Sequence, residues 1–506
     1  MTITERNPAT TPDDVLLLIF ILLSMKDLRA VSMVCRSWST LAVDTLWRQH
    51  QVPLSAVAAK LPMFASTTEG MKDVRCTMLD SAHQQEWADF NYRFANKITH
   101  LHFDEALKEG LSKSLSKVLE AGIDGPSSLF PNLRKLTISA DAAQCEVNLN
   151  FDLTFKLLVT TSLIFVDIQN HQIRQLQRIP SILQTLLDST RHLRTLRIFQ
   201  NSLNGMETIQ APAEGFGAFL ELRILHLSDL TFPGWRSLEE CPKLEEIELH
   251  YYGYKGAGEE GELDSGIVLK RLHTFHLSVR AKSSFPRRFI QPIMMRTSMP
   301  SLRVLQLPLT CSWRWIRMII ERLQESSPLL EHLALDHHCK ETWSLVELLR
   351  PFSRLDCLVL VPLGNTGPFD NKHMEHISRE LPRLRRIAFM TIGSGTTPML
   401  TEGVLISLAR YSLALEDLRI DLDLINFERP ESITPHTSLR KLRVRAVNLS
   451  QGAIQPFASF LSELFPNITV STFSIAIKPH DGDEGVESRV ALKKAFINAK
   501  SSAALG

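Results

Sequence analysis

The sequence has few cysteines and almost no net charge. Its 506 residues include seven scattered cysteines with no C-x-x-C pair, and the formal charge is +1. An odd set of thiols with this spacing predicts neither a disulfide framework nor a zinc knuckle, and favours the reducing cytosol or nucleus. A nearly neutral chain has no bulk attraction for nucleic acid or for an anionic membrane. We therefore expect neither of these as a partner.

Apolar runs long enough to cross a membrane are missing too. The run VLLLIFILL covers residues 15–23, whereas a helix needs about 20 residues to span a bilayer. Asp13 and Asp14 precede the run, where a secretory signal would have Lys or Arg. The run therefore predicts a helix of the folded protein, not a membrane span or a signal peptide.

Motifs of catalysis and of cofactor binding are also missing. There is no Walker-type lysine, and Gly393-Ser394-Gly395 lacks the Gly-x-Ser-x-Gly pattern of a nucleophile elbow. The candidate metal ligands, His337-His338-Cys339 and His373-x-x-His376, lie in different repeats without a matching second pair. We expect no cofactor, no metal site and no catalytic residue, and so a protein that is not an enzyme.

Three helix starts occur within the first fifty residues. Thr11 suits an N-cap and Pro12 the first helical position, and acidic residues follow at the positive end of the helix dipole. Ser24 and Asp27 predict a capping box at the start of a second helix. Apolar residues at three-four spacing predict a third helix from about Arg36 to Gln49.

The first of these helices has more apolar surface than so small a unit can cover. Leucine, isoleucine and phenylalanine occupy positions all around it between residues 16 and 23. Either the rest of the chain covers this surface, or the helix docks into a groove on a partner. The residues alone leave both alternatives open.

The order of residues in this region resembles the F-box motif over its whole length. The matching residues are Pro12, Asp14-Val15-Leu16, Ile19-Phe20, Leu22-Leu23, Asp27-Leu28, Val34-Cys35-Arg36, Trp38, Asp44 and Leu46-Trp47. Two positions depart from the family pattern: Thr11-Pro12 stands where Leu-Pro is usual, and Asp14 stands where Glu is common. Both departures keep the helix cap and the acid.

This resemblance implies a partner. F-box proteins are the substrate receptors of cullin-type ubiquitin ligases, and their three-helix motif binds the adaptor Skp1, which links them to a cullin. Carried over by position, the adaptor-facing or motif-core residues are Pro12, Val15, Leu16, Ile19, Phe20, Leu23, Leu28, Val34, Cys35, Trp38 and Trp47. Among apolar neighbours, Cys35 is expected to be a small buried thiol and not a reactive one.

One phrase recurs from residue 98 onward: leucine, two residues, leucine or isoleucine, one residue, leucine or isoleucine. Its copies begin at Ile98, Leu133, Leu163, Leu193, Leu222, Leu244, Leu272, Leu302, Leu330, Leu355, Leu384, Leu415 and Leu439, with a weak last copy at Ile468. The mean spacing from Leu133 to Leu439 is about 28 residues, which matches leucine-rich repeats. Each phrase predicts a strand whose leucines point into a stacked core. Strand-like phrases speak against an armadillo or HEAT array of helices.

Together these patterns predict an α/β protein in which a small three-helix F-box precedes a leucine-rich-repeat solenoid, or horseshoe. The expected divisions are a flexible N-terminus at 1–10, the F-box at 11–50, a helical connector at 51–97, the solenoid at 98–475, and a C-terminal cap or disordered tail at 476–506. Amphipathic stretches between the phrases predict helices, and a last helix is expected at Val490 to Ala499.

Side chains between the strand leucines point outward and line the concave face of such a solenoid. In the last repeats they are Arg386, Asp417, Arg419, Asp421, Lys441, Arg443 and Arg445. They form either a solvated charged face or a surface that binds a target protein. Recognition of phosphate by the arginines is the more specific hypothesis.

The leading hypothesis is a substrate-recognition subunit of an SCF-type (Skp1–cullin–F-box) E3 ubiquitin ligase, located in the cytoplasm or the nucleus. Its F-box would bind Skp1 and its repeats would hold a target protein of unknown identity. Its contribution would be proximity and not chemistry. The alternatives are a repeat scaffold without a ligase role, whose F-box-like helices only cap the array, and an enzyme with an unrecognised site.

Overall fold

The computed structural model describes residues 13–49, 51–53, 56–57, 89–90, 92–103, 129–138, 155, 158–170, 179–200, 215–228, 230, 232–251, 266–279, 291, 293–309, 313–337, 343–362, 370–390, 400–469, 471–478 and 484–505. The chain divides into two compact units. Unit 1 is residues 1–245 with 254–261, and unit 2 is residues 246–253 with 262–506.

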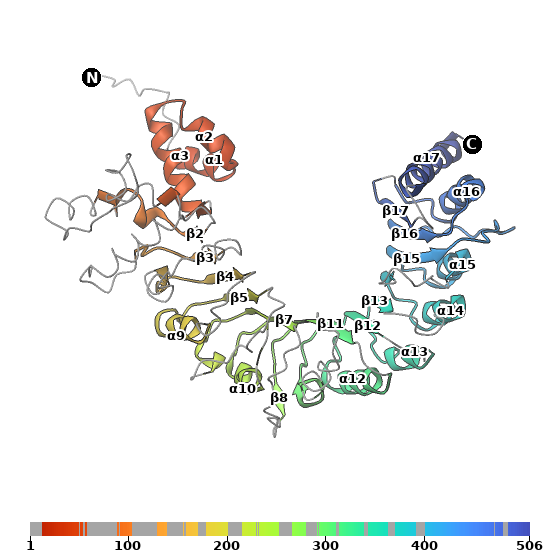
Figure 1. Cartoon of the computed structure of the whole chain (residues 1–506), viewed down its shortest axis with the longest axis horizontal. Helices are drawn as coiled ribbons and strands as arrows, with labels where there is room; N and C mark the ends of the chain where they lie inside the picture. The colour runs from red at the N-terminus through yellow and green to blue at the C-terminus, as the bar shows by residue number, and fades with distance from the viewer. Residues whose placement is uncertain are drawn as a thin grey trace, which may run out of the picture. The chain divides into compact units, whose positions relative to one another are not determined.

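Unit 1 begins with the three predicted helices, α1 (Asp13–Ile21), α2 (Met25–Val31) and α3 (Arg36–Gln49) (Figure 1). Ser24 is the N-cap of α2: its hydroxyl accepts the Asp27 N–H at 3.2 Å and donates to the Asp27 carboxylate at 2.6 Å. This cap satisfies one of the N–H groups that the first turn of a helix leaves without a partner.

A small apolar core joins the three helices. Phe20, Leu28 and Ala42, one residue from each helix, are fully buried. The Phe20 ring meets the Trp38 ring edge to face, with centroids 5.9 Å apart. Such an aromatic pair adds about 0.5–1.5 kcal/mol to the stabilisation from burial alone.

The region after α3, predicted to be a helical connector, contains helical residues at 56–57, 89–90 and 92–93 and also a short strand. Within it the structure describes residues 51–53, 56–57, 89–90 and 92–97. β1 (Val52–Pro53) is an edge strand that runs parallel to β2 (His100–Phe103), a position where proline is tolerated because an edge can spare one N–H. A 3-10 turn, η1 (Ala95–Lys97), joins this edge to α3 through an ion pair of Lys97 Nζ with Asp44 Oδ1 at 2.6 Å.

The repeats of unit 1 form a parallel sheet. After β1 and β2 its strands follow in chain order: β3 (Lys135–Ile138), β4 (Phe165–Asn170), β5 (Thr195–Gln200) and β6 (Ile224–Leu227). The described helices and turns beside them are α9 (Ile179–Ser189), η4 (Phe216–Ala218), α10 (Phe232–Ser237) and η5 (Leu238–Glu240). A strand, a helix or turn, and then a parallel neighbouring strand is the arrangement of a leucine-rich repeat.

Unit 2 has the same pattern. Its strands, parallel and in chain order, are β7 (Glu246–Tyr251), β9 (Thr274–Val279), β11 (Val304–Leu309), β12 (His332–His337), β13 (Cys357–Pro362), β14 (Arg386–Phe389), β15 (Asp417–Asp423), β16 (Lys441–Val447) and β17 (Phe473–Lys478). Its described helices are α12 (Trp313–Ser326), α13 (Trp343–Leu349), α14 (Asn371–Glu380), α15 (Glu402–Tyr411), α16 (Ile454–Leu464) and α17 (Glu484–Leu505), with a 3-10 turn η6 (Gln451–Ala453) before α16. A separate parallel pair joins β8 (Ile267–Val268) and β10 (Thr297–Ser298).

The leucines of the phrase form the core of both units. The first leucine of each copy is buried: Leu133, Leu163, Leu193, Leu222, Leu244, Leu272, Leu302, Leu330, Leu355, Leu384, Leu415 and Leu439. Each repeat covers the leucines of the next, because no single repeat could bury its own. The predicted α/β architecture of a three-helix module followed by leucine-rich repeats is confirmed.

The last repeat differs from the prediction. The weak phrase starts at Ile468, but β17 starts at Phe473, which pairs with Leu442 of β16. Ile468 is buried, and a turn follows it before the strand begins. In this turn the Thr469 carbonyl accepts a hydrogen bond from the Thr472 hydroxyl at 3.1 Å. This polar turn shifts the strand beyond the position that the spacing predicts.

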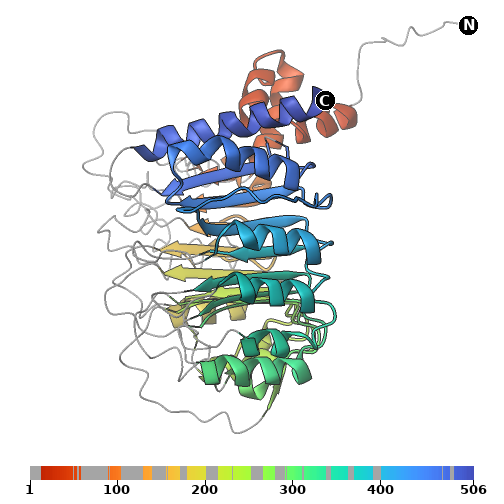
Figure 2. The same ribbon diagram turned by 90° about the vertical axis from the view of Figure 1, so that its right-hand side faces the viewer.

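The final helix covers the end of unit 2. α17 is longer than the predicted Val490 to Ala499 and packs on α16 and β17 (Figures 1 and 2). Phe496 of α17 is fully buried and stacks on Phe473 of β17, with centroids 4.2 Å apart. An end repeat needs such a cover, because its apolar side has no further repeat to pack on.

Replacing Lys500 with methionine is expected to destabilise this cover by about 1–2 kcal/mol, since hydrogen bonds from a charged group are lost. Lys500 Nζ donates to the carbonyl oxygens of Phe465 and Pro466, at 2.9 and 2.8 Å, just after α16 ends. The measurement is hydrogen exchange of the α16 and α17 amides. Lys493→Met, at an exposed position of α17, is the control, and equal effects of the two substitutions would contradict the assignment.

Candidate functional site

The three-helix module of unit 1 leaves large apolar side chains in solvent. They lie on α1 and just after it, and in the turn after α2: Val15, Leu18, Ile19, Ile21, Leu22, Met33 and Val34. We call this set the apolar patch. Leu22 and Met33 are both 85% exposed. Where exposed apolar groups are contiguous, they are a common feature of sites that bind another protein.

The structure shows which side of α1 is covered by the chain, a question that the sequence alone leaves open. Leu16 and Phe20, four residues apart, are buried inside unit 1, whereas Leu18 and Leu22, also four residues apart, are exposed. Residues at this spacing share a helix face. The chain therefore covers one side of α1 and leaves the other side available to a partner.

The residues predicted to face an adaptor or to form the motif core fall into three groups. The buried ones are Leu16, Phe20 and Leu28. The half-buried ones are Leu23, Trp38 and Trp47, and the exposed ones are Val15, Ile19, Val34 and Cys35. Pro12 lies outside the described residues. The buried group holds the module together, whereas the exposed residues, and the half-buried ones in part, are accessible to a partner.

Four members of the apolar patch are missing from the predicted set: Leu18, Ile21, Leu22 and Met33. For Leu18 and Leu22 the signal was present, because both lie on the α1 face opposite Phe20 by helical spacing. Met33 lies in a turn, where periodicity gives no signal. The family pattern alone does not distinguish core positions from outward ones.

Cys35 corrects a prediction. It was expected to be buried, but it is exposed at the start of α3. A hydrogen bond with the Ser37 hydroxyl, 3.3 Å from its Sγ, lowers the pKa of the Cys35 thiol. The turn between α2 and α3 places it outward, whereas its apolar sequence neighbours suggested burial.

The second candidate surface is formed by outward side chains of β14, β15 and β16 in unit 2, which we call the strand face. The parallel register places Arg386, Asp417 and Lys441 in one row across the strands. Arg419 and Arg443 are neighbours in the next row. Arg386, Lys441 and Arg443 are exposed, and Arg419 Nε lies 4.0 Å from Asp417 Oδ1. The strand face therefore presents more positive than negative charge.

Asp421 and Arg445 differ from the other predicted target-facing residues. They are paired in register across β15 and β16, and the Arg445 guanidinium donates to the Asp421 carboxylate. Asp421 is only 2% exposed. The sequence predicts that Asp421 faces a target. Its carboxylate is instead paired with Arg445 and buried.

The metal candidates of the sequence have other surroundings. Asp370 is the N-cap of α14 and accepts the N–H groups of Lys372 and His373, and the His373 Nδ1 lies 2.6 Å from Asp370 Oδ1. His338 and Cys339 lie outside the described residues. Among the described residues no group of three or more His, Cys, Asp or Glu side chains could hold a metal ion. None of the described helices combines the length and the apolarity that crossing a bilayer requires.

Comparison with known proteins finds a family match at the N-terminus. The F-box-like family model matches residues 12–51, the region of α1, α2 and α3. No curated protein matches the chain in sequence.

The matches to solved structures include two at low identity. An internalin (InlF) from Listeria monocytogenes is 12% identical, with a TM-score of 0.27, over 72% of this chain and 89% of its own. The leucine-rich-repeat-containing protein LegL7 from Legionella pneumophila is 11% identical, with a TM-score of 0.29, over 76% of this chain and 94% of its own. The repeat assignment here rests on the chain's own phrase and its parallel strands. The chain therefore consists of an F-box-like domain at residues 12–51 followed by leucine-rich repeats.

Proposed function

We propose that this chain is the substrate-recognition subunit of an SCF-type E3 ubiquitin ligase. The F-box-like domain would bind a Skp1-like adaptor and, through it, a cullin, while the repeats would hold a target protein. The observation that supports the proposal most directly is the apolar patch, because it lies on the F-box-like domain and its side chains are exposed in the part of the chain that the structure describes. Large apolar side chains in solvent are stabilised when a partner buries them.

In this proposal the chain is not an enzyme and takes no cofactor. Its role is to raise the effective concentration of the target near the groups that transfer ubiquitin. It works in the cytoplasm or the nucleus, where its thiols remain reduced. Targets would bind on the strand face, whose exposed charges orient a partner.

The test is complex formation between the purified full-length chain and a Skp1-like adaptor, measured by size-exclusion chromatography with light scattering. We expect a one-to-one complex that then binds the N-terminal part of a cullin. A folded chain that stays monomeric with the adaptor at concentrations of about 10 μM, well above the Kd of a stable complex, would refute the ligase role. The repeat-scaffold alternative would then be retained, because it needs no adaptor.

A further inference from the structure

The residue that follows the first leucine of the phrase forms ion pairs between adjacent repeats. Arg223 lies 3.2 Å from Glu245, Arg303 lies 3.5 Å from Glu331, and Arg385 lies 3.8 Å from Glu416. In each pair an arginine of one repeat meets a glutamate of the next repeat. At this position of the phrase, the charge of each of these arginines is therefore balanced by a glutamate of the next repeat.

Unit 1 contains an exception to this pattern. At the same phrase position, three successive repeats carry Arg134, Ile164 and Arg194. The backbone register is the usual one: Ile164 N–H donates to the Arg134 carbonyl and Arg194 N–H donates to the Ile164 carbonyl, both at 2.9 Å. Isoleucine therefore occupies the place where a glutamate could pair with both arginines. Among the described residues neither Arg134 nor Arg194 has an ion-pair partner.

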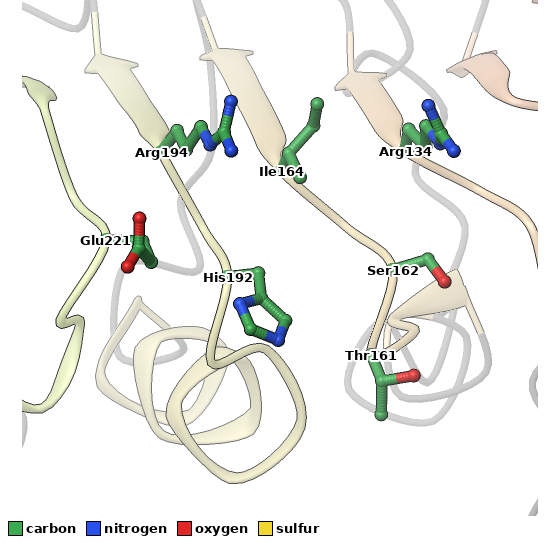
Figure 3. Close-up of a pocket in the computed structure, with 7 residues that line it drawn as sticks. All are labelled: Arg134, Thr161, Ser162, Ile164, His192, Arg194 and Glu221. Atoms are coloured by element: carbon green, nitrogen blue, oxygen red, sulfur yellow. The ribbon is translucent and has the colours of Figure 1, made fainter.

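These two arginines line a hollow of about 370 Å³ at the edge of the sheet where the strands begin. Figure 3 shows them on either side of Ile164, with His192 and Ser162 in the segments that lead into the strands. The hydroxyls of Thr161 and Ser162 add neutral donors to the lining. The strands of Arg134 and Arg194 are two spacings, roughly 10 Å, apart, so their long side chains can converge over Ile164.

The lining also contains one carboxylate, that of Glu221, which is paired with Lys243 and is influenced more weakly by the charge of Arg194. Lys243 Nζ lies 2.5 Å from Glu221 Oε1. This hydrogen bond with Lys243 is the main reason that the pKa of the Glu221 carboxyl is lowered. Because Lys243 balances Glu221, the two guanidinium groups leave the hollow with a net charge of about +2 from fully ionised side chains.

We propose that this hollow binds a phosphate monoester group. A phosphate group at neutral pH carries a charge close to −2 and three strong acceptor oxygens. Guanidinium groups match phosphate in charge and geometry, since each can donate two parallel N–H bonds. The hydroxyls of Thr161 and Ser162 supply donors for the remaining oxygen. This site goes beyond the proposed function, because it lies outside the F-box-like domain and its binding does not require an adaptor.

Three variants of the full-length chain test the site. Arg134→Gln with Arg194→Gln removes both charges and leaves a shorter, neutral polar side chain at each position. Ile164→Glu restores the carboxylate that other repeats have, and keeps both arginines. Arg303→Gln is the control, because Arg303 occupies the same phrase position in unit 2 but is paired with Glu331. All four substituted positions are at least partly exposed, and melting temperatures check that the variants fold.

The probes are inorganic phosphate and a short glycine-rich peptide that carries one phosphoserine, each titrated by calorimetry in chloride buffer. We expect the wild type and Arg303→Gln to bind alike. The double glutamine variant and Ile164→Glu are expected to bind about 100-fold more weakly or not at all, since two charge-assisted hydrogen-bonding groups are removed or occupied. Ile164→Glu should also melt at the wild-type temperature or above it, because it forms new ion pairs.

The two probes distinguish the source of the phosphate. If the phosphopeptide binds at least about tenfold more tightly than phosphate, the ligand is a phosphorylated protein segment; equal affinities indicate a small free phosphate ester. Both results support the site. Binding that is absent in the wild type, present equally in the double glutamine variant, or lost equally in Arg303→Gln would overturn it. None of these outcomes affects adaptor binding, so this site and the proposed function fail independently.

Discussion

Replacing Leu18 and Leu22 with aspartate is expected to weaken binding of the Skp1-like adaptor by about 100-fold or more. Each leucine that becomes buried in a complex contributes about 1.5–3 kcal/mol, and two such losses correspond to a factor of roughly 10² to 10⁴. Buried charge increases the loss. Both residues are exposed, Leu18 on α1 and Leu22 just after it, so the change should leave the F-box-like domain folded. Calorimetric titration of the full-length variant with the adaptor measures the effect.

The chain offers a matched control for this experiment. Leu413 is 67% exposed, close to the 64% of Leu18, but it lies in unit 2. Leu413→Asp introduces the same charge at a similar exposure and should leave adaptor binding unchanged. If the Leu18 and Leu22 variant binds as tightly as the wild type, or if Leu413→Asp weakens binding equally, the apolar patch is not the adaptor surface.

The choice of residues decides whether such an experiment is informative. By family position alone, Leu16 and Phe20 would be natural targets for substitution. Phe20 is 1% exposed and belongs to the core with Leu28 and Ala42. Truncating a buried phenylalanine costs about 3–5 kcal/mol. Loss of binding in a Phe20 variant would therefore report unfolding of the module and not a lost contact.

The repeats show how far the sequence alone predicts the structure. Leu133, Leu302 and Leu439 are buried where the phrase places them, because a stacked core requires a leucine at each turn and the period repeats that requirement. The helices α12 and α15 were also predicted from apolar residues at three-four spacing. Periodic features are predictable because one physical constraint acts many times along the chain.

Features that occur once were not predictable in the same way. The exposure of Cys35 depends on the turn between α2 and α3, and β17 starts late because of the polar turn before Phe473. The apolar patch was predicted only in part, since separating Leu22 from Phe20 requires knowing which side of α1 the other helices cover. Predicting which arginines pair with a glutamate of the next repeat requires the register between the strands, and the phrase does not give this register.

The strand face combines both kinds of feature. Alternation along a strand correctly predicts that Arg443 is exposed, but it also predicts exposure for Asp421, which is covered. The parallel register brings Arg445 beside Asp421, and their pairing allows the carboxylate to be buried. A buried carboxylate without a partner would be strongly destabilising. The pair therefore contributes to the stability of β15 and β16, while Arg386, Lys441 and Arg443 remain available to a target.

Arg445→Ala is accordingly expected to destabilise the end of unit 2 by about 1–3 kcal/mol, because it removes a charge-assisted hydrogen bond to the buried Asp421 carboxylate. Arg443→Ala removes the same charge from the same strand at an exposed position and should change stability by about 0.5 kcal/mol or less. Urea unfolding, with hydrogen exchange at the β15 and β16 amides, compares the two variants.

A double variant separates pairing from general loss of contact at Arg445. Asp421→Ala together with Arg445→Ala removes the buried carboxylate along with the guanidinium that pairs with it, so it should recover much of the stability that Arg445→Ala loses. Binding of a target would respond in the opposite order: Arg443→Ala would weaken it, whereas the double variant would retain most of it. If Arg445→Ala destabilises no more than Arg443→Ala does, the pair is an ordinary surface contact, and all these charged residues are equally available to a target.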